Sequence, residues 1–166
     1  MNGPRFYLYW QCSPALDAAE QATIPSRRLL RAALAVVLAE YPSVDGSLEI
    51  SLQFLSSSEM AAVNGEFRGR PQPTNCLSFP APVQAWPGRR RPLGDILLCP
   101  PQIQAEAEAQ GKALRDHYRH LLIHSALHLL GHDHQEEGEA LIMEALETRL
   151  LAQLGVADPY RTQSDE

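Results

Sequence analysis

The chain has 166 residues with 45% apolar and 20% charged side chains, which suits a folded domain with a sizeable core and excludes an intrinsically disordered protein. No apolar run approaches the roughly 18 to 20 residues that a membrane-spanning helix needs, so we expect no membrane partner. The formal net charge of -6 argues against a protein that wraps nucleic acid over its whole surface, but it permits a local basic groove.

The first half of the chain alternates predicted strands and helices. Aromatic content predicts a strand at 5–10, and an apolar stripe predicts a helix over 26–41 that Ser26 caps and Pro42 ends. Residues 48–54 alternate apolar and polar side chains, which indicates a strand with one buried face. Ser56 and Glu59 form a capping-box signature for a short helix, with Met60, Val63 and Phe67 expected to point inward.

Two short strands and three helices are predicted in the second half. The strands cover 76–79 and 96–99, the latter central and fully buried, with a loop at 81–92 rich in Pro, Gly and Arg. The helices cover about 101–110, 113–130 and 135–154, and glycines end each of them. We therefore predict an α/β (α+β) single domain, in which a mixed sheet of about four strands packs with five or so helices.

All six histidines fall between positions 117 and 134. His124 and His128 stand four residues apart on a predicted helix, so their rings share one face. Gly131 then interrupts the helix, and the chain can return to bring His134 to the same point. Three imidazoles suit one Zn²⁺ ion with an open fourth position for water. The spacing thus predicts a metal site of His124, His128 and His134 at the C-terminal end of a long helix.

The same spacing is the three-histidine zinc pattern of metzincin proteases. Those enzymes carry a glutamate after the first histidine as general base, whereas this chain has Ser125 there. A serine hydroxyl cannot hold a proton from zinc-bound water at neutral pH, so the peptidase base is missing. For His117 and His120 we expect structural roles, although His120 lies about one turn before His124 and could sit near the metal behind its ligands. His132 lies in the turn and could be a spare ligand, but we expect it to be exposed. Asp133 could orient a ligand histidine or cap the last helix.

Three segments together resemble the YbeY family of bacterial rRNA-maturation endoribonucleases. They are the histidine stretch 124–134, the segment from Asn64 through Arg68 to the Thr-Asn-Cys-Leu-Ser-Phe-Pro of 74–80, and the Leu-Gly-Asp-Ile-Leu-Leu-Cys of 93–99. The similarity spans about 48–150. The family usually has Gly where Ser125 stands, Tyr where His132 stands and Asp where Asn75 stands. None of these departures removes a metal ligand, but Asn75 puts any acid–base role at that position in doubt.

The resemblance implies a zinc-dependent, single-strand-specific endoribonuclease that acts in 16S rRNA 3′-end maturation and ribosome quality control. It implies one Zn²⁺ ion as cofactor and, as partners, single-stranded RNA of an rRNA precursor, the small ribosomal subunit and an assembly GTPase. Arg68, carried over from the family's arginine, would be the catalytic residue that pairs with a phosphate. The nucleophile, water or the RNA 2′-hydroxyl, and the general base stay open.

Two other functions are compatible with the sequence. The ligand spacing favours a metzincin-like metalloprotease, which Ser125 opposes. A non-catalytic ribosome-assembly factor with structural zinc is the other, but a chain this long folds on its own core.

The location follows from the N-terminal segment and the cysteines. The segment lacks the pattern of a signal peptide, and Cys12, Cys76 and Cys99 cannot all pair with one another. We therefore expect reduced thiols in a cytoplasmic protein. Residues 1–160 are expected to form the single metal-dependent hydrolase domain, and 161–166 a disordered tail.

Overall fold

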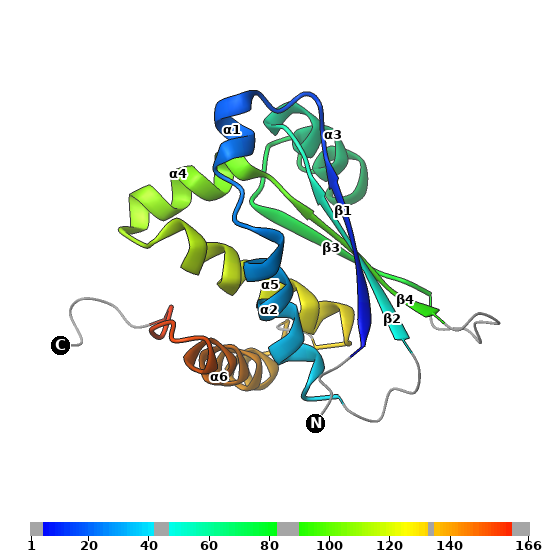
Figure 1. Ribbon diagram of the computed structural model, residues 1–166, viewed down its shortest axis with the longest axis vertical. Coiled ribbons are helices and arrows are strands. Elements are labelled where there is room, and N and C mark those ends of the chain that lie inside the picture. The colour runs from blue at the N-terminus through cyan, green and yellow to red at the C-terminus, as the bar shows by residue number, and fades with distance from the viewer. Residues whose placement is uncertain (1–4, 42–46, 83–89, 133–134, 161–166) are drawn as a thin grey trace.

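A computed structural model describes residues 5–41, 47–82, 90–132 and 135–160 of the chain. Figure 1 shows the described elements, which are β1 (Phe6–Cys12), α1 (Ala18–Ala22), α2 (Arg27–Leu38), β2 (Ser47–Phe54), α3 (Ser57–Arg68), β3 (Cys76–Pro80), β4 (Arg90–Leu98), α4 (Pro100–Gln110), α5 (Leu114–Leu129) and α6 (Glu137–Gln153). None of the helices in these ranges is long and apolar enough to cross a membrane. The expected tail at 161–166 lies outside the described residues.

The four strands form one mixed sheet in the order β1-β2-β4-β3. β1, β2 and β4 run parallel, and β3 pairs antiparallel with β4 at the edge. β4 is therefore an inner strand, as its continuous apolar run predicted. This arrangement confirms the predicted α/β architecture with a small mixed sheet.

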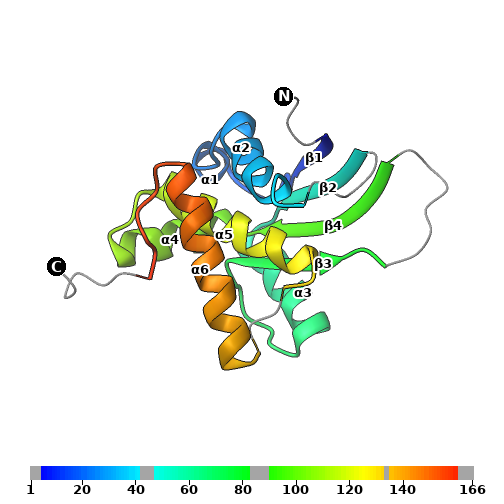
Figure 2. The ribbon, with the colours of Figure 1, turned by 90° about the horizontal axis from the view of Figure 1, so that it is seen from below.

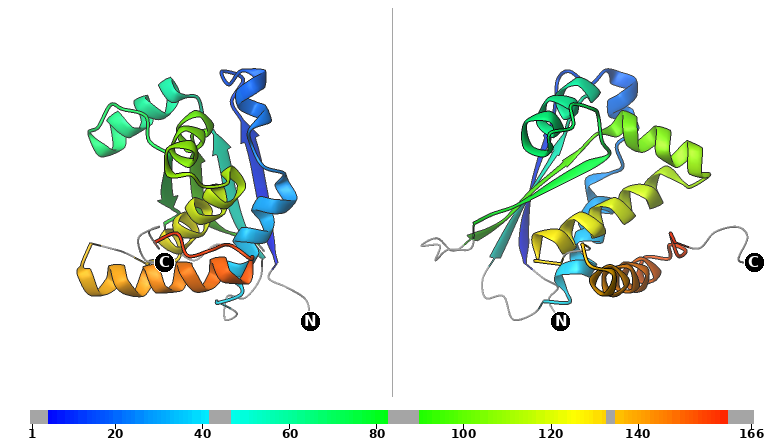
Figure 3. Two further views of the ribbon diagram at one scale, coloured as in Figure 1. Left: turned by 90° about the vertical axis from the view of Figure 1, so that its left-hand side faces the viewer. Right: turned by 180° about the vertical axis from the view of Figure 1, so that it is seen from behind.

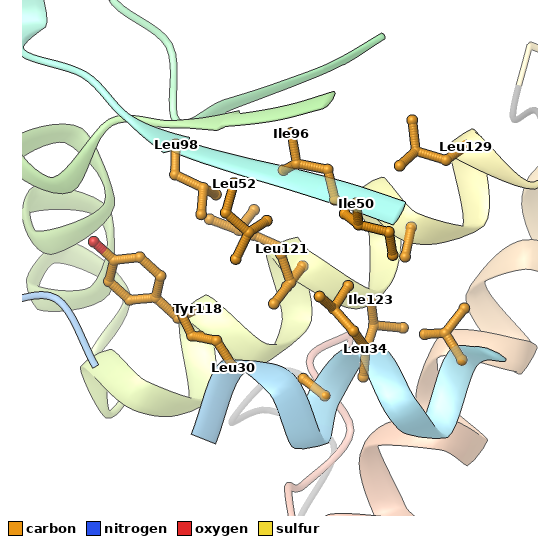
Figure 4. Packing of buried hydrophobic residues seen from close by; sticks show 14 of the residues in the cluster. Leu30, Leu34, Ile50, Leu52, Ile96, Leu98, Tyr118, Leu121, Ile123 and Leu129 are labelled. Atoms are coloured by element: carbon orange, nitrogen blue, oxygen red, sulfur yellow. The ribbon is translucent and has the colours of Figure 1, made fainter. Parts of the chain in front are cut away.

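The main core lies between the sheet and the helices α2 and α5. Figure 4 shows how this layer is filled by Leu30 and Leu34 of α2, Ile50 and Leu52 of β2, Ile96 and Leu98 of β4, and Tyr118, Leu121, Ile123 and Leu129 of α5. These side chains are all less than 8% exposed, and burial of a large apolar side chain contributes about 1.5–3 kcal/mol each. Helix α5 thus fits between the sheet and α6, as the two views of Figure 3 show.

Two details of the sequence prediction are wrong. Phe67 was expected to point inward but is 60% exposed, although its ring still contacts that of Phe79. The predicted loop at 81–92 ends early, because Arg90 and Arg91 already pair with β2 as the start of β4. Pairing with a neighbouring strand supplies hydrogen bonds that the local sequence does not reveal. Helix α1, which Asp17 and Glu20 cap reciprocally, was not predicted.

Candidate metal centre and its cleft

A cleft of about 660 Å³ opens where α5 runs beside the edge strand β3. Four segments of the chain line it. They are Arg68 at the end of α3; Asn75, Cys76, Leu77, Ser78 and Pro80 in β3 and just before it; His120, Leu121, His124, Ser125 and His128 on α5 with Gly131, His132 and Gln135 after it; and Tyr160. Figure 2 shows α5, α6 and β3 meeting in this part of the molecule. Residues from four separate stretches of the chain thus share one concave surface.

His124 and His128 occupy successive turns of α5, and their rings meet edge to face. Their Nε2 atoms lie 3.1 Å apart. Two Zn–N bonds of about 2.05 Å at a tetrahedral angle would place the two nitrogens about 3.3 Å apart. The pair therefore fits as two ligands of a single ion, and the ring nitrogens already converge as such ligands must.

The third predicted ligand, His134, lies outside the described residues, as does Asp133. Within the described ranges, no group of three or more His, Cys, Asp or Glu side chains could hold a metal ion. The described part of the site consequently supplies two imidazoles, on the helix turn that leads to Gly131. Gly131 has φ +97°, a left-handed conformation that turns the chain away from the α5 axis.

Glu147 on α6 is fully buried and contacts the ring of His124 on the side opposite to His128. Its Oε1 accepts a hydrogen bond from Nδ1 of His124. In the neutral ring this leaves the lone pair on Nε2, the atom that faces His128. Metal-binding histidines commonly donate their other ring N–H to a carboxylate in this way, which fixes the ring and raises its basicity.

The second oxygen of Glu147 is held by two more groups. His120 Nε2 lies 3.2 Å from Oε2, and the Tyr160 hydroxyl donates to the same oxygen. The rings of His120 and Tyr160 meet edge to face, with centroids 5.4 Å apart. Burial alone would raise the pKa of Glu147, but the hydrogen bonds from His120, His124 and Tyr160 outweigh it and lower the pKa to about 2. Glu147 is therefore an ionised carboxylate beside the histidine pair.

Arg68 is the last residue of α3 and is exposed at the cleft. Gly69 follows with φ +69° and ends the helix in a left-handed cap, so the arginine stands at a sharp turn. The structure thus brings the predicted arginine and two predicted histidines to one cleft, from positions far apart in the sequence.

Ser125, the residue in place of the metzincin glutamate, is 1% exposed, and its hydroxyl donates to the Cys76 sulfur at 3.4 Å. Desolvation raises the pKa of the Cys76 thiol to about 11, with the Ser125 hydrogen bond acting weakly the other way. Cys76 is therefore a neutral thiol at pH 7. Cys12, Cys76 and Cys99 are all free, as predicted.

The remaining predicted positions have structural partners. His117 is buried and lies 2.9 Å from Glu106, which also accepts a hydrogen bond from the Asn75 side chain. This ties the start of β3 to α4 and accounts for the amide at position 75. His132 was expected to be exposed but is half-buried, with its ring bonded to the Tyr41 hydroxyl.

Glu147 and Tyr160 were not predicted from the sequence. A signal for Glu147 was present, because it shares the buried stripe of α6 with Met143, Leu150 and Leu151. A glutamate at such a position needs a partner, since an unpaired buried charge is costly. Tyr160 gave no such signal, because it follows the helix in an irregular segment.

A cleft with converging imidazoles, a buried carboxylate behind one of them and an arginine at its rim has the composition of a metal-dependent hydrolase site. The comparisons agree with that class. The chain matches the family model Endoribonuclease YbeY over residues 16–155 and belongs to this family.

Similar proteins cover nearly the whole chain. An Endoribonuclease YbeY from Chromohalobacter salexigens is 44% identical over 89% of this chain and 98% of its own length. Another, from Paramagnetospirillum magneticum, is 46% identical over 92% of this chain and 93% of its own. The solution structure of TM1509 from Thermotoga maritima has the same fold, with a TM-score of 0.53 at 18% identity over 94% of this chain and 100% of that one.

Proposed function

We propose that this protein is a zinc-dependent endoribonuclease that cuts single-stranded RNA in the α5–β3 cleft. Family membership supports the reaction, and the observation that carries the assignment to this cleft is the pair of Nε2 atoms 3.1 Å apart beside Arg68. The RNA would be an rRNA precursor, cut in the maturation of the 16S 3′ end and in ribosome quality control. The small ribosomal subunit and an assembly GTPase would be its partners in the cytoplasm, and residues 1–160 its single hydrolase domain.

His124, His128 and His134 are the proposed ligands of one Zn²⁺ ion. Such an ion, when bound by three neutral imidazoles, supplies Lewis acidity toward water or a phosphate oxygen. Glu147 contributes by fixing the ring of His124 in the tautomer whose Nε2 faces the cleft. The buried Ser125 points its hydroxyl at Cys76, so it has no part in proton transfer in this proposal.

Arg68 is the proposed phosphate-binding residue. Its guanidinium can form two parallel hydrogen bonds to phosphate oxygens and stabilises the charge that builds up on them in the transition state. The position at the cleft, exposed and followed by a glycine turn, suits a residue that must meet a polymer entering from solvent. The overall charge of -6 makes such local basic groups necessary for an RNA substrate.

The test compares cleavage of a single-stranded RNA by the wild-type protein, His128→Ala, Arg68→Ala and Arg68→Lys, with metal content measured on each sample. We expect His128→Ala to lose metal and activity together. Arg68→Ala should keep its metal and lose about 100-fold or more in kcat/KM, with Arg68→Lys recovering only part, because a point charge cannot make the paired contact.

Arg115→Gln is the matched control, since this exposed arginine on α5 lies away from the cleft. RNA decay that is equal in wild type and all variants would mean that a contaminant cuts the RNA, and the proposal would be wrong. Zinc-dependent digestion of an unfolded protein would instead support a metzincin-like protease, which the ligand spacing alone favours.

A further inference from the structure

The chain after α6 turns back and brings Tyr160, the last described residue, to the cleft. Figure 2 shows this segment running back alongside α6. Lys112 Nζ donates to the carbonyl oxygen of Pro159 at 3.5 Å. A carboxylate oxygen of Asp158 accepts hydrogen bonds from the Thr148 hydroxyl at 3.4 Å and from the Tyr160 amide at 2.9 Å. These contacts fix the backbone at Tyr160 independently of its ring.

The Tyr160 side chain is anchored at its hydroxyl and open at its ring. The hydroxyl donates to Oε2 of Glu147, and burial together with this hydrogen bond raises the pKa of Tyr160, so the group stays protonated at neutral pH. The ring meets that of His120 edge to face, yet Tyr160 is 41% exposed and lines the cleft. A tyrosine that served only to anchor the chain would bury its ring, because buried aromatic area is its main stabilising contribution. The ring is therefore a rigid apolar surface that is available to a ligand in the cleft.

A single carboxylate connects this ring to the candidate metal centre. Glu147 accepts the Tyr160 hydroxyl on Oε2 and Nδ1 of His124 on Oε1, and Nε2 of the same histidine faces His128. Glu147 thus sets the ring and a proposed metal ligand relative to each other. A strand whose phosphate lies at the metal centre has its neighbouring groups within reach of the ring.

The surroundings of the ring favour a base over a second phosphate. Among the described residues that line the cleft, Arg68 is the only arginine or lysine. Lys112 lines a separate hollow of about 310 Å³. Tyr160 itself contacts two carboxylates, those of Glu147 and Asp158, so a phosphate placed at the ring would meet negative charge. A nucleobase is uncharged and has an aromatic face that stacks on such a ring.

We propose that an unpaired base of the RNA stacks on Tyr160 when a phosphate of the same strand lies at the metal centre, and that this contact selects single strands. Bases in a duplex cover the faces of one another, whereas a single strand can splay its bases onto an aromatic ring. Stacking accepts every base, so the contact recognises strandedness without a strong sequence preference. The proposal rests on the proposed function for the substrate and its place in the cleft.

The test changes the ring and the hydroxyl separately. Tyr160→Leu keeps an apolar side chain but removes the ring, whereas Tyr160→Phe keeps the ring and removes the hydroxyl. Fluorescence anisotropy gives the Kd of a single-stranded 2′-O-methyl oligonucleotide, whose integrity is checked after each titration, and bound zinc is measured on every sample. We expect Tyr160→Leu to bind about 10-fold more weakly and to cleave the corresponding RNA with a raised KM and an unchanged kcat. Tyr160→Phe should recover most of the binding.

An abasic scan of the oligonucleotide separates a stacking contact from a structural effect. Each base is removed in turn, and the Kd is measured for wild type and both variants. One abasic position should weaken the wild type and Tyr160→Phe about 10-fold and leave Tyr160→Leu unchanged, because base and ring are the two halves of one contact. A purely structural role predicts the same abasic profile for all three proteins.

Tyr9→Leu is the matched control. It makes the same substitution at a tyrosine that is 50% exposed on β1 and does not line the cleft. This variant should bind and cleave as the wild type does, and melting curves check that every variant is folded.

The outcomes distinguish the stacking contact from the nuclease. An equal Kd and an equal abasic profile for wild type and folded Tyr160→Leu would overturn the stacking contact, even if both proteins cut RNA normally. Tyr160→Phe that binds as weakly as Tyr160→Leu would overturn it too, as would a loss of zinc in Tyr160→Leu with an unchanged Kd, which would make Tyr160 a positioning residue for Glu147. A loss of binding confined to one base, in a protein that cuts no RNA, would support the contact and contradict the nuclease.

Discussion

A single buried carboxylate, Glu147, connects the candidate metal centre to the C-terminal part of the chain. It accepts hydrogen bonds from His124 and Tyr160 and lies beside His120, while its own position is fixed by the buried face of α6. The orientation of a proposed metal ligand therefore depends on residues that a search for metal-binding motifs does not consider. This is the physical reason why the spacing of the histidines predicted part of the site and missed the remainder.

Replacement of Glu147 should weaken metal binding before it changes the fold. In Glu147→Gln the side chain keeps its size but loses its charge, so His124 becomes a poorer ligand, and we expect zinc affinity to fall by about 10- to 100-fold. Glu147→Ala also leaves a cavity and unpartnered groups, and should cost about 2–4 kcal/mol of unfolding free energy. Competition with a chelator measures the first effect and urea titration the second.

The control for this experiment is Glu139→Gln, an exposed glutamate in the first turn of the same helix. It should bind zinc with wild-type affinity. If Glu147→Gln did the same, the carboxylate would be a structural group without influence on the metal.

Gly94 explains one of the segments on which the family resemblance rests. It has φ +148°, and a Cβ built there would lie 2.4 Å from the Phe79 carbonyl oxygen and 2.8 Å from Leu129. No residue with a side chain fits this contact without moving β3 or α5. The glycine thus allows β3 and the end of α5, which form the cleft, to approach β4 closely.

Among the elements, helices with strong caps were predicted best. Ser26 caps α2, and Ser56 and Glu59 form the predicted capping box of α3. These signals are local, since a capping residue and its target amide are three residues apart. Helix α1 has five residues, too few to show a helical period, and it escaped notice. Phe67 was misplaced because the last turn of α3 extends beyond the sheet corner that the helix covers.

Glu59 ties the start of α3 to the segment after β1, and this contact should depend on pH. Its Oε1 accepts hydrogen bonds from the Ser13 hydroxyl at 2.6 Å and the Ser56 amide at 3.0 Å. The hydrogen bond from Ser13, followed by that from the Ser56 backbone, lowers the pKa of Glu59 against the opposing effect of burial. A carboxyl group whose pKa is lowered on folding stabilises the protein above its unfolded pKa, and this contribution is lost as the pH falls.

We therefore expect Glu59→Gln to lower the free energy of unfolding by about 1 kcal/mol at pH 7. The difference from wild type should shrink as the pH falls below about 4.3, the pKa of an unperturbed glutamate, because the wild-type carboxyl then becomes protonated. Urea titrations at several pH values measure this. A difference that stays constant from pH 7 to pH 3 would show that the charge of Glu59 is irrelevant.

At the scale of the molecule, the strand order could not be read from the sequence. β4 inserts between β2 and β3 and pairs with both, and its parallel pairing with β2 joins segments that α3 and β3 separate in the chain. That insertion places β3 at the edge beside α5, and hence Arg68, which precedes β3, at the same cleft as the histidines. The sequence motifs predicted the chemical groups of the site, whereas the pairing of distant strands determines which of these groups come together in the cleft.

The size of the core predicts whether the protein stays folded without its metal. A chain that folds on its own core keeps its fold when a catalytic metal is removed, whereas a protein with structural zinc unfolds. The described core is formed by the sheet with α2, α5 and α6, and the histidine pair lies at its margin. A metal that binds only the folded state stabilises it by about 2.7 kcal/mol at a concentration 100-fold above its Kd. For a chain of this length that amounts to a rise in Tm of roughly 5 to 10 °C.

Removal of the metal with a chelator should therefore lower Tm by that amount and leave a folded protein with an unchanged far-UV circular dichroism spectrum. His128→Ala should have the low Tm with or without zinc, because only two of the three proposed ligands remain and they bind the ion too weakly. The measurement is a pair of melting curves for each protein. Unfolding of the wild-type chain at 25 °C on removal of zinc would contradict a self-sufficient core, and would favour the assembly factor whose metal is structural.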